Sequence, residues 1–354
     1  MTHALQEPAD DRLPDRIESV EQLEEVMSRP TAAAIAGLSE VPGDLVLLGV
    51  GGKMGPTLAR MAVRATRAAG GKRRVIGVSR FSEPGLEAKL NAARVETVRC
   101  DLLDPRQVET LPDAANVVAM TGMKFGASSQ PELTWAMNAH VPALVCRRYA
   151  ASRVVAFSTG NVYALSPVVL GGSTERDAPA PVGEYAASAL ARERMYAYFA
   201  KAHGTPTAIL RLNYAQDLRY GVLVDLARKV AAGEPIDLAM GNFNALWQGD
   251  ANAMALAAFA HAASAAFIVN LAGPETVSVR RVCEAFGQRL GRDPRFVGSE
   301  SADALLSDGQ LGHHLYGYPR VSLSRMVGWI AEWVRASGAS LGKPTHFEVR
   351  DGKY

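Results

Sequence analysis

Regularly spaced glycines are the feature of this sequence that most plainly suits a chemical role. Gly49, Gly52 and Gly55 lie three residues apart, between a short apolar run and a helical stretch that begins near Pro56. A pyrophosphate is bound by backbone N–H groups and the positive end of a helix dipole, and only residues without a Cβ let the backbone come close enough. The loop therefore predicts a dinucleotide site, the alternative being a tight strand-to-helix turn without a ligand. The predicted contacts in the loop are Gly49, Gly52, Lys53, Met54 and Gly55.

Residues after the second expected strand distinguish the two nicotinamide dinucleotides by charge. An acid there binds the adenosine ribose 2′-hydroxyl, whereas a basic residue accommodates a 2′-phosphate. This sequence has Ser79 and Arg80 at that point and no acid until Glu83. We therefore expect NAD(P) as the cofactor, with NADP favoured over NAD. The alternative is that Arg80 is a solvated surface residue.

Further cofactor contacts are expected after the third and fourth strands. Asp101 and Leu102 follow the third strand, where the carboxylate can accept a hydrogen bond from an adenine amino group; a helix N-cap is the other role open to Asp101. Thr121 follows the fourth strand, whose carboxyl end borders the same crevice. These three residues complete the predicted dinucleotide site.

Apolar runs that alternate with helical stretches must position these residues. A parallel connection needs a long crossover, and strands covered on both faces are continuously apolar. The pattern therefore predicts an α/β fold with a doubly wound, Rossmann-type parallel sheet. The expected strands are 45–50, 74–79, 93–100, 116–122, 153–159 and 206–212, and the expected helices between them are 55–69, 105–111, 131–150 and 183–203.

Changes in composition and hydrophobic pattern along the chain predict four parts. They are an acidic helical extension (1–43), the dinucleotide-binding domain (44–212), a smaller substrate domain that can return strands to the first (213–340), and a tail (341–354). In the extension, Ser19 and Gln22 resemble a capping box that opens a helix packed on the body, the alternative being a partner-binding arm. In the substrate domain we expect a strand at 267–273 and helices near 251–264, 278–291 and 321–336.

Composition excludes several classes of protein. With 354 residues, 48% hydrophobic and 21% charged, the chain is neither a disordered nor a disulfide-scaffold protein, and a net charge of +2 makes nucleic acid an unexpected partner. Its three cysteines have no metal or redox spacing, so we expect no metal and a reducing compartment. The sequence has neither an export signal nor a long apolar run, so we expect a cytoplasmic protein without a membrane segment.

Several motifs together resemble the extended short-chain dehydrogenase/reductase family, which includes NAD(P)-dependent epimerases, dehydratases and reductases of nucleotide sugars. The resemblance covers most of residues 44–335. It implies a cofactor-bound enzyme acting on a sugar-like secondary alcohol, and a homodimer as the common assembly. The motifs are GVGGKMG (49–55), Asp101-Leu102, Asn138, FSTGNVYA (157–164), TERDAPAPVGEYAAS (174–188), ILRLNYA (209–215) and WQGDANAMAL (247–256).

The resemblance also implies two catalytic residues. In the family a Ser or Thr at the end of the fifth strand and a Tyr about 25 residues later flank the nicotinamide, and Thr159 and Tyr185 occupy these positions. A secondary alcohol gives up hydride only as its O–H proton leaves. A phenol can take that proton while a second hydroxyl holds the oxygen. The expected roles are base for Tyr185 and oxygen partner for Thr159.

One departure from the family removes a charge. The family motif is Tyr-x-x-x-Lys, but this chain has Ala189 four residues after Tyr185. A phenol has a reference pKa of about 10, and an opposite charge within about 4–6 Å favours its ionised form. We expect Lys124, which follows the fourth strand, to replace the missing cation; the alternatives are a surface or substrate-anion role. Arg192 lies two helical turns from Tyr185, roughly 10 Å along the axis, and is a poor replacement by this spacing.

A second departure concerns the substrate. Family members that bind nucleotide sugars carry an arginine before the segment that matches WQGDANA, where this chain has GNFNAL (241–246). A free sugar, sugar acid or polyol is therefore as plausible a substrate as a nucleotide sugar. We expect an NAD(P)-dependent epimerase/dehydratase-type oxidoreductase. The alternative is a dinucleotide-binding protein that has lost catalysis and regulates a partner, which the loss of the lysine favours.

Overall fold

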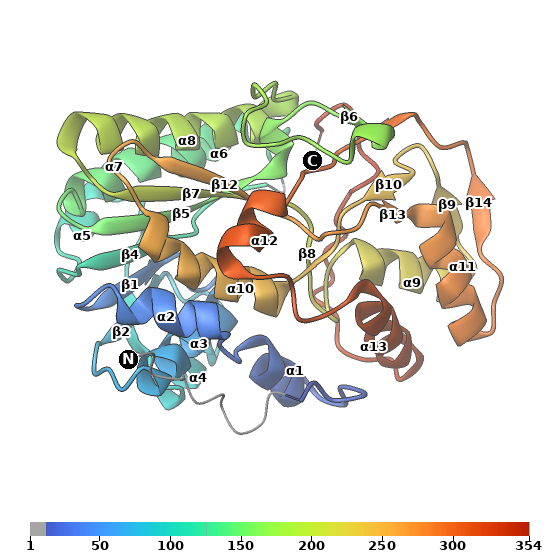
Figure 1. The fold of residues 1–354 in the computed structure, drawn as a ribbon, viewed down its shortest axis with the longest axis horizontal. Helices are drawn as coiled ribbons and strands as arrows, with labels where there is room; N and C mark the ends of the chain where they lie inside the picture. The colour runs from blue at the N-terminus through green and yellow to red at the C-terminus, as the bar shows by residue number, and fades with distance from the viewer. Residues whose placement is uncertain (1–11, 125, 354) are drawn as a thin grey trace.

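The computed structural model describes residues 12–124 and 126–353, which form a seven-stranded parallel sheet at the centre of the molecule (Figure 1). Its strands are β1 (Leu45–Leu48), β2 (Val75–Ser79), β3 (Glu96–Arg99), β4 (Asn116–Ala119), β5 (Arg153–Thr159), β7 (Thr207–Leu212) and β12 (Phe267–Leu271). They lie in the order β12-β7-β5-β4-β1-β2-β3, and every neighbouring pair is parallel. The winding reverses between β1 and β4, where ligand crevices form in such sheets. The predicted doubly wound α/β fold is confirmed.

Helices cover both faces of the sheet (Figure 1). One layer contains α2 (Ala32–Ser39), α3 (Gly55–Ala68) and α10 (Gln248–Ala257), and the other contains α5 (Pro105–Glu109), α7 (Val141–Arg148) and α8 (Gly183–His203). The short helices α4 (Leu86–Ala92) and α6 (Pro131–Trp135) flank these layers, and α6 continues into α7 through a π-helical turn, η1 (Ala136–His140). Successive residues of β1 enter opposite apolar clusters, with Leu45 and Leu47 in one and Val46 and Leu48 in the other. Burial on both faces explains why the strand is apolar throughout.

A second region packs beside the sheet around its own apolar cluster, which includes Trp247, Phe286 and Trp329. Its helices are α1 (Val20–Met27), α9 (Val222–Ala232), α11 (Val279–Leu290) and α13 (Leu323–Arg335), and α12 (Gln310–Tyr316) lies against β12. Short strands and 3₁₀ turns connect this part of the chain. They are β6 (Ser166–Pro167), β8 (Ala215–Gln216), β9 (Pro235–Asp237), β10 (Asn242–Phe243), β11 (Leu246–Trp247), β13 (Val277–Ser278), β14 (Arg295–Val297), β15 (Asp303–Ala304), η2 (Gly160–Val162), η3 (Val168–Leu170) and η4 (Ala258–His261).

The N-terminal extension is helical, as predicted, and lies against the body. Ser19 caps α1 by accepting a hydrogen bond from the Gln22 amide at 3.1 Å, and the Gln22 side chain accepts one from the Glu18 amide at 2.7 Å. Leu23 and Met27 are fully buried in the apolar cluster of the second region. The sequence prediction for residues 1–11 lies outside the described residues.

Shortening a buried side chain of α1 tests whether this helix stabilises the fold. We expect Leu23→Ala to lower the free energy of unfolding by about 2–5 kcal/mol, because it removes buried methyl groups and leaves a cavity. Urea unfolding measures the change. Glu21→Ala on the exposed face of the same helix is the control and should lower the unfolding midpoint far less, because this carboxylate contributes only exposed contacts at the start of the helix. Equal stability of the Leu23→Ala variant and the wild type would contradict this packing.

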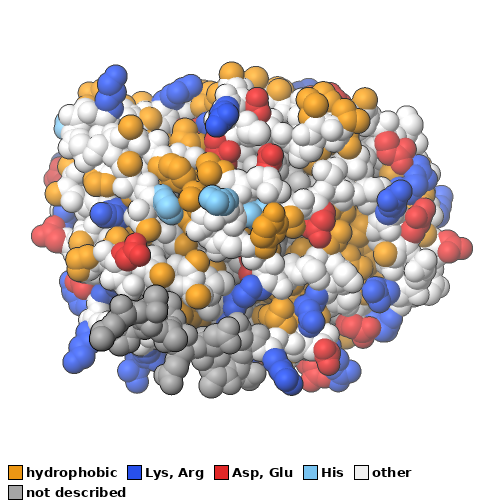
Figure 2. Space-filling view, viewed as in Figure 1, with side chains coloured by type: hydrophobic (Ala, Val, Ile, Leu, Met, Phe, Trp, Pro, Cys, Tyr) orange, Lys and Arg blue, Asp and Glu red, His pale blue; other side chains and the backbone are white. Residues whose placement is uncertain are grey.

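The surface carries mixed charge. On the face seen in Figure 2, acidic and basic side chains are interspersed rather than separated by sign. Within the described part of the chain, no helix combines the length and apolar character needed to cross a bilayer.

Candidate active site

A cavity of about 1070 Å³ lies at the carboxyl ends of the central strands. Its walls come from the glycine loop, the segments after β4, β5 and β7, the start of α8, helices α1 and α4, and the C-terminal segment 340–345. Seven residues predicted from the sequence to form the site line it together: Gly49, Gly52, Lys53, Met54, Lys124, Thr159 and Tyr185. The fold thus brings the predicted phosphate loop and the predicted catalytic groups to one cavity.

The glycine loop has the backbone geometry that a phosphate cradle requires. Gly49 has a φ of +86°, a conformation that favours glycine, and its carbonyl accepts a hydrogen bond from the Gly52 amide at 3.0 Å. A Cβ on Gly55 would lie 2.2 Å from the Val50 carbonyl oxygen, so this glycine allows α3 to start close to β1. Met54, the N-cap residue of α3, makes no side-chain capping bond. The first turn of α3 therefore presents its dipole to the cavity without a side-chain cap.

Gly52 offers a test of this loop that spares the fold. A Cβ there would approach only the Gly49 carbonyl, at an ordinary 3.4 Å, and otherwise enter the cavity. We expect Gly52→Ala to weaken dinucleotide binding about tenfold or more, since the methyl group displaces a phosphate from at least one amide, which is worth about 1.5–3 kcal/mol. Calorimetry measures the dissociation constant. Gly328→Ala in α13, where a Cβ meets open space, is the control; equal affinity of the two variants would contradict the cradle.

Lys53 points from the glycine loop toward the second region. Its ammonium group donates to the Ala215 carbonyl at 3.2 Å and lies 4.2 Å from the centroid of the Tyr220 ring. Burial, against the opposing effect of Asp217 and with the help of the charges of Arg219 and Lys124, lowers the pKa of Lys53 to about 8. The cavity thus contains several cationic groups close enough to influence one another.

Thr159 and Tyr185 come from different elements. Thr159 ends β5, and its hydroxyl donates to the Asn161 side-chain oxygen at 3.0 Å and accepts from the Asn161 amide at 3.2 Å. Tyr185 lies in the first turn of α8 and is half-buried. Asn161 lines the same cavity, so it orients the Thr159 hydroxyl beside the space that a ligand would fill.

Lys124 lies near Tyr185, as predicted from the position of its segment after β4. Its ammonium group is 5.9 Å from the centroid of the Tyr185 ring and donates to the Thr345 carbonyl at 3.3 Å. Burial lowers the pKa of Lys124 to about 8, although Asp225 and Glu348 oppose the shift. The cation is therefore present at neutral pH and lost above about pH 8.

Arg192 also lines the cavity, although the spacing argument set it aside. Two helical turns separate the backbones of Tyr185 and Arg192, but a distance along the helix axis does not include the length of the side chain. Side chains on a helix tilt toward its N-terminus, and an arginine is long enough to reach back over the preceding turn. An arginine two helical turns after Tyr185 was therefore the feature of the sequence that could have identified Arg192 as a residue lining the cavity.

Other predicted contacts do not line the cavity: Gly55, Ser79, Arg80, Asp101, Leu102 and Thr121. The Ser79 hydroxyl accepts from the Phe81 amide at 3.3 Å, and Arg80 is exposed. The Asp101 carboxylate accepts from the Leu103 amide at 3.1 Å, so it closes a local turn. The alternative of a helix N-cap at Asp101 is wrong, because Asp104 caps α5 through the Arg106 amide.

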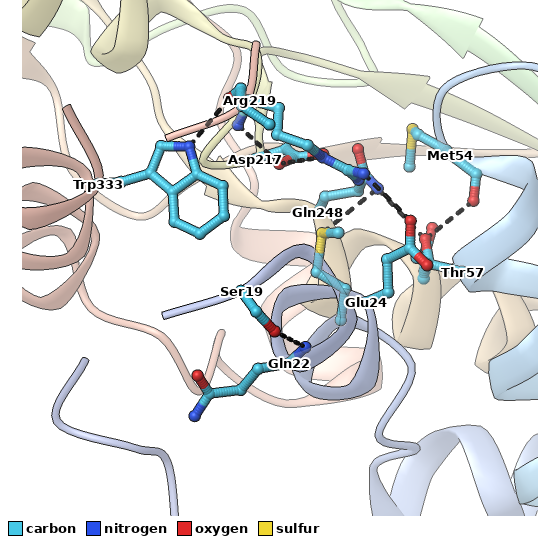
Figure 3. Close-up of polar contacts among 12 residues, drawn as sticks. Ser19, Gln22, Glu24, Met54, Thr57, Asp217, Arg219, Gln248 and Trp333 are labelled. Carbon is cyan, nitrogen blue, oxygen red and sulfur yellow. Dashed lines mark hydrogen bonds and ion pairs between the residues drawn. The ribbon is translucent and has the colours of Figure 1, made fainter. Parts of the chain in front are cut away.

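The two ends of the described chain contribute walls that the sequence did not predict. Glu24 of α1 forms an ion pair with Arg219 at 3.1 Å, and Arg219 pairs with Asp217 at 2.9 Å (Figure 3). From the other end, the Leu341 amide donates to the Arg219 carbonyl at 3.1 Å. The Thr345 hydroxyl donates to Asp225 at 2.6 Å. Both ends are thus held at the rim of the cavity by polar contacts with the segment that follows β8 and with α9.

Beneath the cavity lies a buried ionic network. Arg211 of β7 donates to both carboxylate oxygens of Glu193, at 2.9 and 2.7 Å, and to the Tyr163 hydroxyl at 2.7 Å. The Ser158 hydroxyl donates to Glu193 at 2.5 Å. Ser158 precedes Thr159, so the network ties the end of β5 to β7 and α8. Burial opposes the charge of Arg211, but its bonds to Glu193 outweigh this effect and raise its pKa.

A metal centre is not among the features of this site: the described residues contain no group of three or more His, Cys, Asp or Glu side chains that could hold an ion. The three cysteines are buried and unpaired.

Solved structures share this fold at low sequence identity. MoeE5 in complex with UDP-glucuronic acid and NAD is 22% identical, with a TM-score of 0.66, over 83% of this chain and 99% of that one. UDP-glucuronic acid 4-epimerase from Bacillus cereus, in complex with UDP-glucuronic acid and NAD, is 17% identical with a TM-score of 0.66 and the same coverage. Pal from Bacillus thuringiensis is 17% identical with a TM-score of 0.70, again over 83% and 99%. Part of this chain therefore has no counterpart in these structures.

Sequence comparison identifies the family. No curated protein sequence matches the chain. The model of the NAD dependent epimerase/dehydratase family matches residues 45–247, more than half of the chain, from β1 to β11. The matched part contains the glycine loop, Thr159 and Tyr185. The chain belongs to the NAD dependent epimerase/dehydratase family.

Proposed function

We propose that the protein is an NAD(P)-dependent oxidoreductase of the epimerase/dehydratase type, which transfers hydride to and from a secondary alcohol of a sugar or nucleotide sugar. The observation that supports this most is the shared cavity, in which the glycine loop and the pair Thr159 and Tyr185 face the same space. Its volume of about 1070 Å³ lies just above the usual range for small-molecule sites, about 300–1,000 Å³, which suits a site that holds a dinucleotide together with a substrate. Solved structures of the same fold bind UDP-sugars and NAD.

The residues present fit a dinucleotide. Gly52 leaves open space where a side chain would block a phosphate, and the uncapped start of α3 favours negative charge. The predicted contacts are the glycine loop, with Ser79, Arg80, Asp101, Leu102 and Thr121 at the adenosine and nicotinamide ends. When bound, the dinucleotide supplies the hydride acceptor and donor.

The protein's own groups would handle the proton. Tyr185 takes the proton of the substrate hydroxyl, and the Thr159 hydroxyl donates to the substrate oxygen in place of Asn161. Lys124, close to the Tyr185 ring, contributes positive charge that favours the ionised phenol. Asn161 holds Thr159 in orientation until a substrate competes for its proton.

The preference between the two dinucleotides is a finer proposal. NADP is favoured because Arg80 follows β2 and no acid precedes Glu83. Arg60 and Lys89 also line the cavity and add positive charge. Dissociation constants for NAD⁺ and NADP⁺, measured on the same preparation, test this; tighter binding of NAD⁺ contradicts it.

We also propose that the protein is a homodimer in the cytoplasm. The family resemblance supports a homodimer, which light scattering of the purified protein tests by mass. The three buried, unpaired cysteines suit a reducing compartment and support a cytoplasmic location. Fractionation of cells that express the protein tests this location.

Dinucleotide binding is expected to weaken as the pH rises above about 8. The Lys53 ammonium, whose pKa is lowered to about 8, is charged below that pH, and an anionic ligand stabilises this charged form. Its contribution to affinity is therefore full near pH 7 and is lost as the pH rises through 8 toward the pKa in the complex. Calorimetry from about pH 7 to about pH 9.5 measures the effect. Lys53→Arg, which stays charged, should show a flatter profile; identical profiles would contradict the role of Lys53.

Activity is tested on the purified protein. Denaturation and identification of any released dinucleotide establish the cofactor, and reduced-nicotinamide absorbance with a panel of sugars and nucleotide sugars detects hydride transfer. A substrate-dependent absorbance change supports the enzyme. So does chromatographic detection of an epimer or dehydrated product without a net absorbance change, because such a reaction returns the hydride to its substrate. Dinucleotide binding without turnover of any substrate contradicts it and supports the regulatory alternative.

A further inference from the structure

The position that carries the family's lysine is apolar in this protein. Ala189 is fully buried and packs with Val162 and Tyr163. A phenol that acts as a base needs a neighbouring positive charge to favour its ionised form. The source of that charge must therefore lie on another residue.

Arg192 reaches the cavity from one turn further along α8. One terminal nitrogen of its guanidinium donates to the Phe157 carbonyl of β5 at 3.0 Å, and the other donates to the side-chain oxygen of Asn138 in η1. Asn138 is itself held, because its amide group donates to the Met123 carbonyl at 3.0 Å and to the Ser188 hydroxyl at 2.9 Å. The guanidinium is thus fixed between β5, η1 and the segment that follows β4.

The chain leaves room for this guanidinium. A Cβ on Gly122 would lie 2.3 Å from a terminal nitrogen of Arg192, so any larger residue there would displace the side chain. Arg192 is 6% exposed, and its Nε has no hydrogen-bond partner among the described residues. The site is therefore built to accept an arginine at the floor of the cavity and leaves one donor unused.

No carboxylate among the described residues forms an ion pair with Arg192. Its acceptors are neutral oxygens, and the neighbouring Glu193 is committed to Arg211. Burial lowers the pKa of Arg192, and ionised Tyr185 would raise it most among the nearby groups, ahead of Tyr196 and Glu193. An arginine stays protonated across the range in which proteins are stable. The titratable groups around Arg192 and Tyr185 are Tyr196 and Glu193 on α8, Lys124 after β4 and Tyr220 after β8.

We propose that Arg192 is a positioning residue for the reaction, whose fixed guanidinium supplies the positive potential that lets the Tyr185 hydroxyl act as a base, in place of a lysine at position 189. The inference rests on the proposed function. It assigns the permanent charge to Arg192 and leaves Lys124 as a supplement that is lost above about pH 8. Because Arg192 acts through Tyr185, its removal should change the pH dependence of turnover as well as the rate.

The experiment compares Arg192→Met with the wild type as the pH is raised. We expect kcat near pH 7 to fall by about 10²–10³-fold, comparable to the loss of one preorganised electrostatic group, while the dissociation constant of the dinucleotide stays within a few-fold. The ratio of variant to wild-type kcat should rise with pH, because alkali ionises the phenol without help. A purely structural role predicts a ratio that does not change with pH, and that result would overturn the proposal.

Two further variants keep the test decisive. Arg192→Lys retains a charge but places a titratable ammonium in a buried site. Near neutral pH its kcat should therefore exceed that of Arg192→Met, and the ratio of its kcat to the wild-type kcat should decline as the pH rises. If that ratio does not change with pH, the proposal is overturned, even if Arg192→Met does not fold. Arg194→Met, at an exposed position on the same helix, is the control and should keep wild-type kcat. If the wild type binds no dinucleotide or turns over no substrate, the proposed function is wrong and the inference fails with it. If the wild type is active and Arg192→Met has the same kcat, only the inference is wrong.

Discussion

Tyr185→Phe is expected to lose kcat by about 10²–10⁴-fold while it binds the dinucleotide as the wild type does. The substitution removes one hydroxyl from a half-buried ring in the first turn of α8 and leaves the ring's packing in place. Without that hydroxyl the cavity lacks the phenol proposed to take the proton of the substrate alcohol as hydride leaves. Steady-state kinetics with the substrate identified from the sugar panel measure the loss.

A matched tyrosine on the same helix controls for the change of residue type. Tyr198 is 60% exposed, so Tyr198→Phe should leave kcat unchanged. Calorimetry on both variants shows whether the cofactor still binds. Undiminished kcat in Tyr185→Phe would remove Tyr185 from the proposed chemistry, whatever the fold.

Glu193→Gln is expected to lower the free energy of unfolding by about 3–5 kcal/mol, because it leaves the Arg211 guanidinium buried without a compensating charge. Both side chains are almost completely buried, at 3% and 4% exposure, and join at 2.7 Å. The amide keeps the shape of the carboxylate but replaces one acceptor oxygen with a donor. That donor faces an Arg211 N–H in either orientation, and in one of them it also faces the Ser158 hydroxyl. Urea unfolding should show a lower midpoint with an unchanged slope.

An exposed pair of the same residue types provides the control. Glu332 and Arg335 join at 2.8 Å on α13 but are about half exposed, so Glu332→Gln should cost at most about 1 kcal/mol. Equal losses for the two variants would mean that burial does not set the value of the Glu193–Arg211 pair. Such a result would contradict the role given to this network beneath the site.

The central sheet could be predicted from the sequence because its strands carry their own signal. Strands buried on both faces are continuously apolar, and the helices between them are long enough for parallel crossovers. The boundaries shifted by a few residues: β4 ends at Ala119 rather than at 122, since the segment that holds Thr121 turns away from the sheet as a loop. The capping pattern at Ser19 likewise predicted the start of α1, because a cap is a local interaction.

The second region was harder to predict because its structure depends on distant contacts. α9 lies in a stretch for which no helix was expected, although its buried residues recur at helical spacing, as Leu223, Leu226 and Val230 show. It packs on α11 and α13, which follow it by dozens of residues in the chain. The C-terminal segment has few apolar residues, yet Phe347 is buried and Thr345 bonds to Asp225 of α9. Contacts of this kind connect residues more than a hundred positions apart, so no local sequence pattern predicts them.

The candidate site was predictable where family motifs and backbone requirements coincide, as at the glycine loop and at Thr159 and Tyr185. Spacing along a helix does not include the reach of a side chain: by spacing Arg192 was a poor replacement for the lysine, yet its side chain lines the cavity. The adenosine-end predictions, such as Arg80 and Asp101, rest on position after a strand, which does not fix where a side chain points. Their contact with the dinucleotide stays a prediction, which the binding measurements test.

Calorimetry with nucleotide-free protein tests the central claim most directly. Wild-type protein, stripped of any bound nucleotide and shown to be folded, is titrated with NAD⁺ and with NADP⁺. Binding of one dinucleotide per chain, weakened in Gly52→Ala, is the result that the cavity and its glycine loop predict. Absence of binding by either dinucleotide to the folded protein would contradict the account.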